Sequence, residues 1–392
     1  MIRLTLGVAT CTVFLCWVLY YTAQQSPRDQ LIVRTSTPSE RLKVSAPQKG
    51  IAHDEGEVVA TESTIPPLDM LIERGNSTMN QHDASRIIAT VDFLLDFAIV
   101  GYAKTATTFV MNWLRHHPDI RMHPYEVHHL TKHDPVGMVQ NLYTLQEEPR
   151  THEQKLHYGY KAPRDIADAA TMQLLSTYWP NTKVIVGVRH PVLWFQSFYN
   201  YRLLTYHELP PPATLVGPCK VDVANHDPQK LATLMQQHKG LHDRGVCTDL
   251  ARFHVHLRNH LLMNDHKSNI TLTRQPTFLY VDEQLGDTQH VAQLQHDLQT
   301  FLGLSTPLSN PMEYRTHLTT TASNSATATG KAFDICHSDF IALRAELLQI
   351  GQEAAAWLID HFLPVSGVSV SCPSCVILLL ETWHIDPCAD AV

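Results

Sequence analysis

The stretch Phe93-Leu-Leu-Asp-Phe-Ala-Ile-Val100 and the loop Gly101-Tyr-Ala-Lys-Thr-Ala-Thr-Thr108 that follows it decide the fold. The first stretch ends in a short apolar run, which is typical of a buried parallel strand. Beyond it, apolar side chains recur at the spacing of one helix face, at Ala106, Phe109, Val110, Trp113 and Leu114. The order strand, loop, helix predicts an α/β protein with a P-loop-like three-layer fold, in which helices flank a central parallel sheet.

This loop has the composition of an anion-binding site. Lys104 lies within it, and Thr107 and Thr108 stand where the helix is expected to begin. The first backbone N–H groups of a helix have no partner within the helix, so they and the two hydroxyls would face one ligand. We therefore expect a phosphate-like group to bind here. The alternative is an ordinary strand-to-helix turn with an exposed lysine.

The loop differs from the ATP-binding Walker A loop, which requires Gly-x4-Gly-Lys-Ser/Thr. Counted from Gly101, residues 106–108 read Ala-Thr-Thr, and the lysine stands at position 104. Nor do we expect a strand that ends in an aspartate placed to hold Mg²⁺. Because a sulfuryl group carries less charge than a phosphoryl group, a lysine and helix-terminal donors could suffice for its transfer. These differences favour sulfuryl transfer.

A second strand, Lys183-Val-Ile-Val-Gly-Val-Arg189, precedes a helix-like run that carries Ser197. Arg189 stands at the carboxyl end of this strand, where open parallel sheets bind ligands, and Ser197 follows eight residues later. An arginine fork and a hydroxyl that converge on one anion would suit a second phosphate. The alternative is a structural arginine that caps a loop.

Other segments complete the predicted layers. Residues 277–282 are typical of a core strand, residues 291–302 of a helix, and residues 338–362 of a long helix that Pro364 ends. The apolar run 376–380 is too short to span a membrane and is expected in the core.

The N-terminal part of the chain is expected to lie outside this domain. Residues 4–21 contain no charge and no proline, which predicts a transmembrane signal-anchor after a cytoplasmic tail of residues 1–3; a cleaved signal peptide is the alternative. Residues 22–92 contain no aromatic residue and are expected to form a disordered lumenal stem, ahead of a catalytic domain over residues 93–392. This arrangement is a single-pass type II membrane protein.

Charge and cysteines constrain partners and compartment. The net charge of −8 is opposite in sign to that of a phosphate-driven nucleic-acid binder, although at pH 6.5 about half of the 25 histidines would be protonated and add roughly +12. An oxidising lumen favours disulfides, so we expect Cys372 and Cys375 to form a structural disulfide and not a redox or zinc pair. A loop closed by Cys219 and Cys247 is also possible, and Asn76 and Asn269 stand in glycosylation sequons.

The residues from about 95 to 205 resemble the sulfotransferases that use 3′-phosphoadenosine 5′-phosphosulfate, and within them the Golgi carbohydrate sulfotransferases of the heparan sulfate N- and 3-O-type. In that family the second motif, here Arg189 and Ser197, binds the 3′-phosphate of the nucleotide. The first loop binds the 5′-phosphosulfate, which implies this role for Lys104, Thr105, Ala106, Thr107 and Thr108.

The same resemblance nominates the catalytic groups. Residues 117–130 are similar to the segment that supplies the general base, which implies Glu126 as the base, with His128 beside it as the alternative. Lys161 is similar to a strand lysine that reaches the active site. Lys331 stands where the family places a loop that closes over the nucleotide.

The sequence therefore predicts a lumen-facing Golgi sulfotransferase that moves a sulfuryl group from 3′-phosphoadenosine 5′-phosphosulfate to a hydroxyl or amine of a glycan. No metal is expected. Two alternatives remain, a P-loop kinase and a non-catalytic glycan-binding membrane protein.

Overall fold

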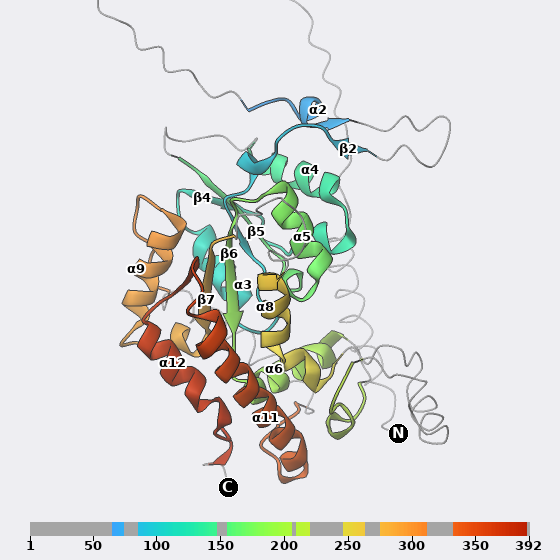
Figure 1. Ribbon diagram of the computed structural model, residues 1–392, viewed down its shortest axis with the longest axis vertical. Helices are drawn as coiled ribbons and strands as arrows, with labels where there is room; N and C mark the ends of the chain where they lie inside the picture. The colour runs from blue at the N-terminus through green and yellow to red at the C-terminus, as the bar shows by residue number, and fades with distance from the viewer. Residues whose placement is uncertain are drawn as a thin grey trace, which may run out of the picture. The chain divides into compact units, whose positions relative to one another are not determined.

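Six parallel strands form the central sheet of the computed structural model (Figure 1), in the order β4-β5-β3-β6-β7-β8. Their bounds along the chain are β3 Phe97–Ile99, β4 Ile120–Met122, β5 His157–Lys161, β6 Lys183–Val188, β7 Thr277–Val281 and β8 Val368–Val370. The structure describes residues 65–73, 85–146, 155–205, 209–219, 246–262, 275–311 and 332–389. All of them belong to the unit Thr64–Val392.

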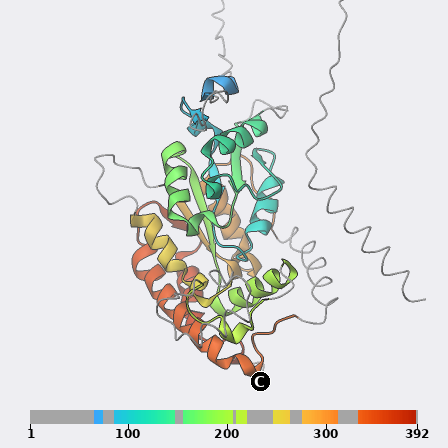
Figure 2. The ribbon, with the colours of Figure 1, turned by 90° about the vertical axis from the view of Figure 1, so that its right-hand side faces the viewer.

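Helices cover both faces of the sheet, because alternate strand side chains enter two different cores (Figures 1 and 2). Phe97, Ile99 and Ile185 pack on one face with α3 (Thr107–Arg115) and α9 (Val291–Leu302). The opposite face is covered by α4 (Pro135–Gln146), α5 (Ala169–Tyr178), α6 (Pro191–Thr205), α8 (Phe253–Leu262), α11 (Ile341–Trp357) and α12 (Pro373–Glu381). The predicted α/β class, with helices flanking a central parallel sheet, is confirmed.

Several predicted elements appear close to their expected bounds. The strand over residues 277–282 is β7, and the helix over residues 291–302 is α9. The long helix expected over 338–362 is divided into a 3₁₀ turn, η9 (Ser338–Phe340), then α11, then a π-helical turn, η10 (Leu358–Phe362). The apolar run 376–380 lies in α12 and is core on one side only, since Leu378 is 63% exposed.

Short 3₁₀ turns connect these elements. They are η2 (Leu130–Lys132), η3 (Asp165–Ala167), η4 (Pro212–Thr214), η6 (Thr248–Ala251), η7 (Asp282–Gly286) and η11 (Thr382–His384).

Some helices and strands precede residue 93, where the catalytic domain was predicted to begin. Residues described there form α2 (Leu68–Leu71), an antiparallel pair of β1 (Ile72–Glu73) with β2 (Arg86–Ile87), and the start of η1 (Asp92–Leu94). Leu71 and Ile72 are buried in the main core. A few aliphatic residues are enough to order this segment, because they add to an existing core and need not form one of their own.

The predicted membrane segment, residues 4–21, and both sequons lie outside the described residues. Among the residues described, no helix is both long and apolar enough to cross a bilayer.

Three disulfides tie the described residues together: Cys219–Cys247, Cys336–Cys388 and Cys372–Cys375. The expected bond between Cys372 and Cys375 and the possible Cys219–Cys247 loop are therefore confirmed.

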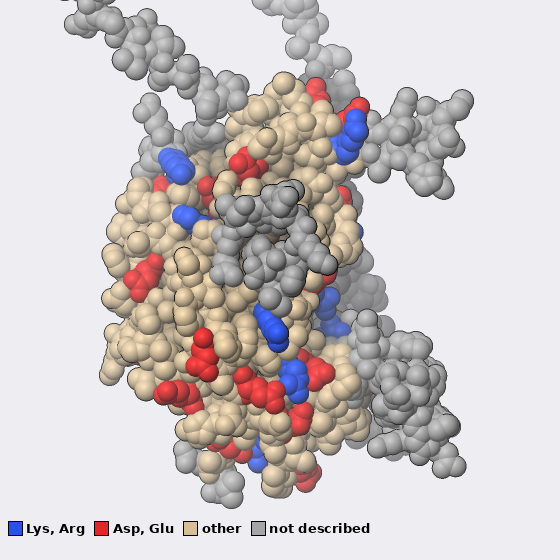
Figure 3. All heavy atoms as spheres, viewed as in Figure 1, with Lys and Arg blue, Asp and Glu red and all other residues tan. Residues whose placement is uncertain are grey.

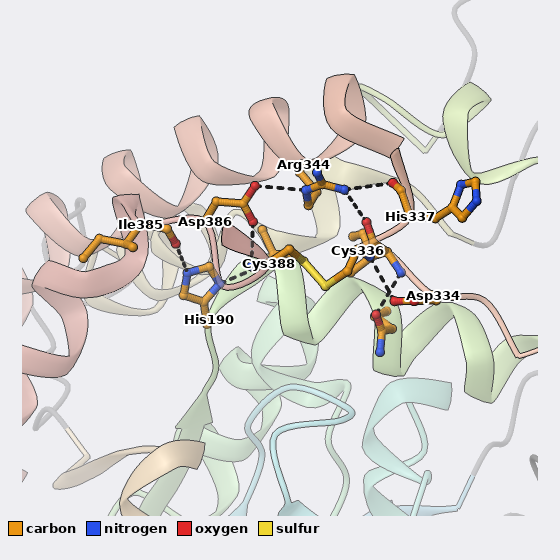
Figure 4. The surroundings of a disulfide bond; sticks show 11 residues. His190, Asp334, Cys336, His337, Arg344, Ile385, Asp386 and Cys388 are labelled. Atoms are coloured by element: carbon orange, nitrogen blue, oxygen red, sulfur yellow. Dashed lines mark hydrogen bonds and ion pairs between the residues drawn. A yellow bond between two sulfur atoms is a disulfide. The ribbon is translucent and has the colours of Figure 1, made fainter. Parts of the chain in front are cut away.

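The Cys336–Cys388 bond fastens the C-terminal segment to the rest of the domain (Figure 4). Beside it, Arg344 Nε donates to Asp386 Oδ2 at 3.0 Å, and Arg344 Nη1 donates to the Ile335 carbonyl at 2.6 Å. His190 Nε2 lies 3.2 Å from the Ile385 carbonyl oxygen. The C-terminal segment thus supports the residue that follows Arg189.

Candidate functional site

The loop between β3 and α3 has the shape of an anion cradle. Lys104 and Ala106 both adopt positive φ, 69° and 58°, which curls the backbone toward the start of α3. No side chain caps α3 at Ala106, so the first N–H groups of the helix remain available to a ligand. The left-handed conformation costs free energy at non-glycine residues, and the surrounding structure must enforce it.

Neighbouring elements hold the loop in this shape. Tyr280 of β7 donates its hydroxyl to the Thr105 carbonyl at 2.7 Å. Trp194 of α6 donates its indole N–H to the Ala103 carbonyl at 2.8 Å. The loop also lies directly against β6, since a Cβ atom at Gly101 would stand 2.5 Å from the Gly187 nitrogen. This close approach brings the lysine of the loop to the end of β6, where Arg189 lies.

Lys104 and Arg189 line the same cavity, whose volume is about 500 Å³, a size suited to a small-molecule ligand. Four cations and two carboxylates contribute to its wall: Lys104, Arg164, Arg189, Arg202, Glu126 and Asp282. On the face drawn in Figure 3, by contrast, basic and acidic side chains are interspersed over the described surface. The excess of positive charge in the cavity favours an anionic ligand.

The charge on Lys104 is poorly compensated in the absence of a ligand. Burial lowers the pKa of its ammonium, and the positive charges of Arg189 and Lys161 lower that pKa further, against the opposing effect of Asp282 and Glu126. Its Nζ lies 5.0 Å from the ring centroid of Tyr201. An anion bound beside Nζ would relieve this repulsion and would favour the charged ammonium.

Glu126 is held at the cavity by a buried lysine. Lys161, at the end of β5, is 2% exposed, and its Nζ donates to Glu126 Oε1 at 2.8 Å. The same ammonium donates to Thr108 Oγ1 at 2.7 Å. Lys161 therefore joins the carboxylate to the first turn of α3. Its ammonium is buried beside the cavity, where it contacts two of the lining residues, Glu126 and Thr108.

His128 offers a second proton acceptor next to Glu126. Its Nε2 lies 3.4 Å from Glu126 Oε2, and the imidazole lines the cavity. Burial lowers the pKa of His128, an effect that the Glu126 carboxylate opposes. The ring is therefore neutral at pH 7 and can accept a proton. Both candidates for the base are thus adjacent.

Beside Lys104 in the same cavity, Arg189 is engaged by a carboxylate to which the sequence analysis gave no role. Arg189 Nε lies 3.1 Å from Asp282 Oδ2, and its Nη1 donates to the Lys104 carbonyl at 3.4 Å. Asp282 directly follows β7, so a strand here does end in an aspartate, and the partner of this carboxylate is Arg189. The predicted strand over residues 277–282 already ended in this aspartate. Because β7 and β6 are neighbours in the sheet, their carboxyl ends bring Asp282 and Arg189 together.

The structure brings most of the nominated residues to one place. The residues that line the cavity are Lys104, Ala106, Thr107, Thr108, Glu126, His128, Arg189 and Ser197. Thr105 is fully buried, and its hydroxyl donates to the Tyr102 carbonyl at 2.7 Å instead of facing the cavity. Lys331 lies outside the described residues.

A second cavity, of about 710 Å³, adjoins the first. The two share six lining residues, which are Ala103, His128, Pro163, Arg164, Phe198 and Arg202. The second cavity is lined further by aromatic rings, Tyr102 and Trp194, and by the polar side chains of Thr131, Lys132 and Asp168. Two ligands could therefore meet at His128, which lies beside Glu126.

Comparison with known proteins adds little to this geometry. No protein-family model matches the chain, and no curated protein does. A crystal structure of a sulfotransferase from Alicyclobacillus acidocaldarius aligns with 60% of this chain and 93% of its own, at 17% sequence identity and a TM-score of 0.38. A likeness this distant carries no argument about function, so the functional interpretation rests on the residues of the cavity.

Proposed function

We propose that the chain is a sulfotransferase that moves a sulfuryl group from 3′-phosphoadenosine 5′-phosphosulfate to a hydroxyl or amine of a glycan. The observation that carries this proposal is one cavity lined by the anion cradle at Lys104 and α3, by Arg189 and Ser197, and by a positioned carboxylate, Glu126. A nucleotide phosphorylated at both the 3′ and the 5′ position would present one anion to the cradle and another to Arg189 and Ser197.

In the proposed donor complex, Lys104 and the N–H groups of α3 hold the 5′-phosphosulfate, because free helix-terminal donors favour negative charge. Arg189 and Ser197 hold the 3′-phosphate. In the ligand-free protein the Arg189 guanidinium forms an ion pair with Asp282. When the 3′-phosphate binds, the guanidinium must therefore divide its hydrogen bonds between the phosphate and this carboxylate.

In the transfer step, an acceptor hydroxyl attacks sulfur, the bond between sulfur and the bridging phosphate oxygen breaks, and the hydroxyl proton passes to Glu126. Lys161 keeps the carboxylate in place at 2.8 Å. A positioned base of this kind contributes about 10²–10⁴ to a rate. Lys104 stabilises the charge that develops on the departing phosphate.

The second cavity is the proposed acceptor site, since it meets the first at His128. We propose that the acceptor is a carbohydrate in the Golgi lumen, with residues 4–21 as the membrane anchor. The three disulfides are consistent with an oxidising compartment.

The first test is retention of the protein on immobilised adenosine 3′,5′-bisphosphate. Arg189→Ala should abolish retention, because a charge-assisted hydrogen bond is worth about 1.5–3 kcal/mol, and a bidentate contact is worth more. Arg115→Ala is the matched control, since Arg115 is exposed at the far end of α3. Equal retention of the two variants would contradict the nucleotide site.

The second test follows transfer of labelled sulfate to polysaccharide acceptors. Lys104→Ala should reduce turnover at least about tenfold, the equivalent of roughly 1.4 kcal/mol in the barrier. Turnover equal to that of the unaltered protein would exclude the proposed role of Lys104. Transfer that persists in a metal chelator would also separate this activity from that of a kinase, which needs ATP and Mg²⁺.

A further inference from the structure

Cys372, Cys375 and His290 come together, and none of the three lines either cavity described above. Cys372 is the residue that precedes α12, Cys375 lies in its first turn, and His290 precedes α9. One ligand atom from each of the three lies within 4.8 Å of the other two. Two sulfurs and an imidazole are the ligands that zinc prefers, and Cys-x-x-Cys is the usual spacing of a zinc pair.

The disulfide between Cys372 and Cys375 differs from the other two in loop length. Its sequence separation is 3, against 28 for Cys219–Cys247 and 52 for Cys336–Cys388. A disulfide stabilises a fold mainly by constraining the unfolded chain, and a short loop constrains it least. This bond therefore contributes less to the stability of the domain than either of the others.

It also differs in access. Cys247 and Cys388 are 0% and 1% exposed, so each of the other disulfides has one fully buried member. Cys372 and Cys375 are both partly exposed. Thiol–disulfide exchange requires a thiolate to reach a sulfur. A small thiol such as glutathione should therefore reduce this pair before the others.

A carboxylate contacts the imidazole of His290. Its Nδ1 lies 2.6 Å from Asp287 Oδ2. The contact fixes the proton on Nδ1 and leaves the lone pair of Nε2 for another partner. A carboxylate behind a histidine is the usual second layer of a zinc site.

We propose that the dithiol form of Cys372 and Cys375, together with His290, binds a soft divalent cation such as Zn²⁺, and that the disulfide form does not. Two small thiols supply the electrons: they become one disulfide, and the protein disulfide becomes two thiols. Binding of the cation then releases both thiol protons, because the thiolate is the ligand. The start of α12 favours the thiolate at Cys372. Water completes the coordination.

The test is a titration of the full chain with Co²⁺, whose thiolate charge-transfer absorption reports sulfur ligation, followed by displacement with Zn²⁺. Limited phosphine treatment should expose two thiols, which mass spectrometry after alkylation assigns to Cys372 and Cys375. The reduced protein should then develop the absorption, and the oxidised protein should not. Reduced protein that gives no more absorption than the Cys372→Ser/Cys375→Ser variant would overturn the proposal.

Two single variants examine the other ligand and its support. His290→Ala should weaken Co²⁺ binding at least about tenfold, and Asp287→Asn about tenfold, as is usual for a second-layer partner. His296→Ala is the matched control, because His296 is exposed in the middle of α9. If His290→Ala binds Co²⁺ as tightly as His296→Ala, the histidine is not a ligand and the three-residue site is wrong.

Discussion

At the scale of single residues, Asp165 combines complete burial with an ionisable group. Tyr160 donates its hydroxyl to Asp165 Oδ2 at 2.8 Å, whereas Oδ1 is buried without a partner among the described residues. Burial raises the pKa of Asp165 to about 7, and the nearby charges of Asp168 and Glu126 also raise it. A carboxyl group of this kind is held in its protonated form below neutral pH.

The raised pKa of Asp165 predicts how stability changes with pH. Between about pH 4 and 7 the folded state keeps the proton and the unfolded state releases it, so this group makes the free energy of unfolding fall as the pH rises. Asp165→Asn removes this pH-dependent contribution to the free energy of unfolding, which amounts to at most about 4 kcal/mol. Urea unfolding at pH 4.5 and 7 should show the variant gaining stability relative to the unaltered protein as the pH rises. Asp339→Asn, at an exposed site, is the matched control. If the stability of Asp165→Asn relative to the unaltered protein were the same at both pH values, the protonated state of Asp165 would be contradicted.

At the scale of elements, the loop before α3 depends on a left-handed residue. Ala106 has a φ of 58°, a conformation that a β-branched side chain resists and glycine accepts. Ala106→Val should therefore lower the free energy of unfolding by about 1–2 kcal/mol and weaken retention on the immobilised nucleotide. Ala106→Gly should keep both. Urea unfolding and retention measure the two effects.

A matched substitution separates backbone strain from helix propensity. Ala170 is exposed in the first turn of α5, so Ala170→Val should cost only about 0.5 kcal/mol. If Ala106→Val lowered the free energy of unfolding no more than Ala170→Val does, and still bound the immobilised nucleotide normally, the left-handed backbone at Ala106 would not be what shapes the anion cradle.

The same elements show what the sequence could and could not predict. The strand, loop and helix around Lys104 follow from local apolar spacing, and Arg189 and Ser197 follow from their position after a strand. Asp282 was missed because its role depends on which strands are neighbours, and this is a long-range property. The burial of Lys161 against Glu126 could not be predicted either, because it depends on how the end of β5 packs against residues distant in sequence.

At the scale of the whole molecule, burial changes the expected charge. Half-protonation of 25 histidines at pH 6.5 would add roughly +12. Burial lowers the pKa of a group of histidines that are therefore mostly neutral at that pH: His128, His157, His190, His254 and His256. The gain in positive charge in a mildly acidic lumen is consequently smaller than the composition suggests.

The disulfides also act at the scale of the whole chain, and their loop lengths predict unequal effects. Cys336–Cys388 spans 52 residues and holds the segment whose Ile385 carbonyl contacts His190. Cys336→Ser/Cys388→Ser should lower the free energy of unfolding by about 4 kcal/mol, and Cys372→Ser/Cys375→Ser by roughly half of that. Urea unfolding of the two double variants under oxidising conditions measures both. The larger loss is expected at Cys336 and Cys388 because the longer loop constrains the unfolded chain more. An equal or larger loss of unfolding free energy in Cys372→Ser/Cys375→Ser would show that the short disulfide stabilises the native state by something other than chain entropy.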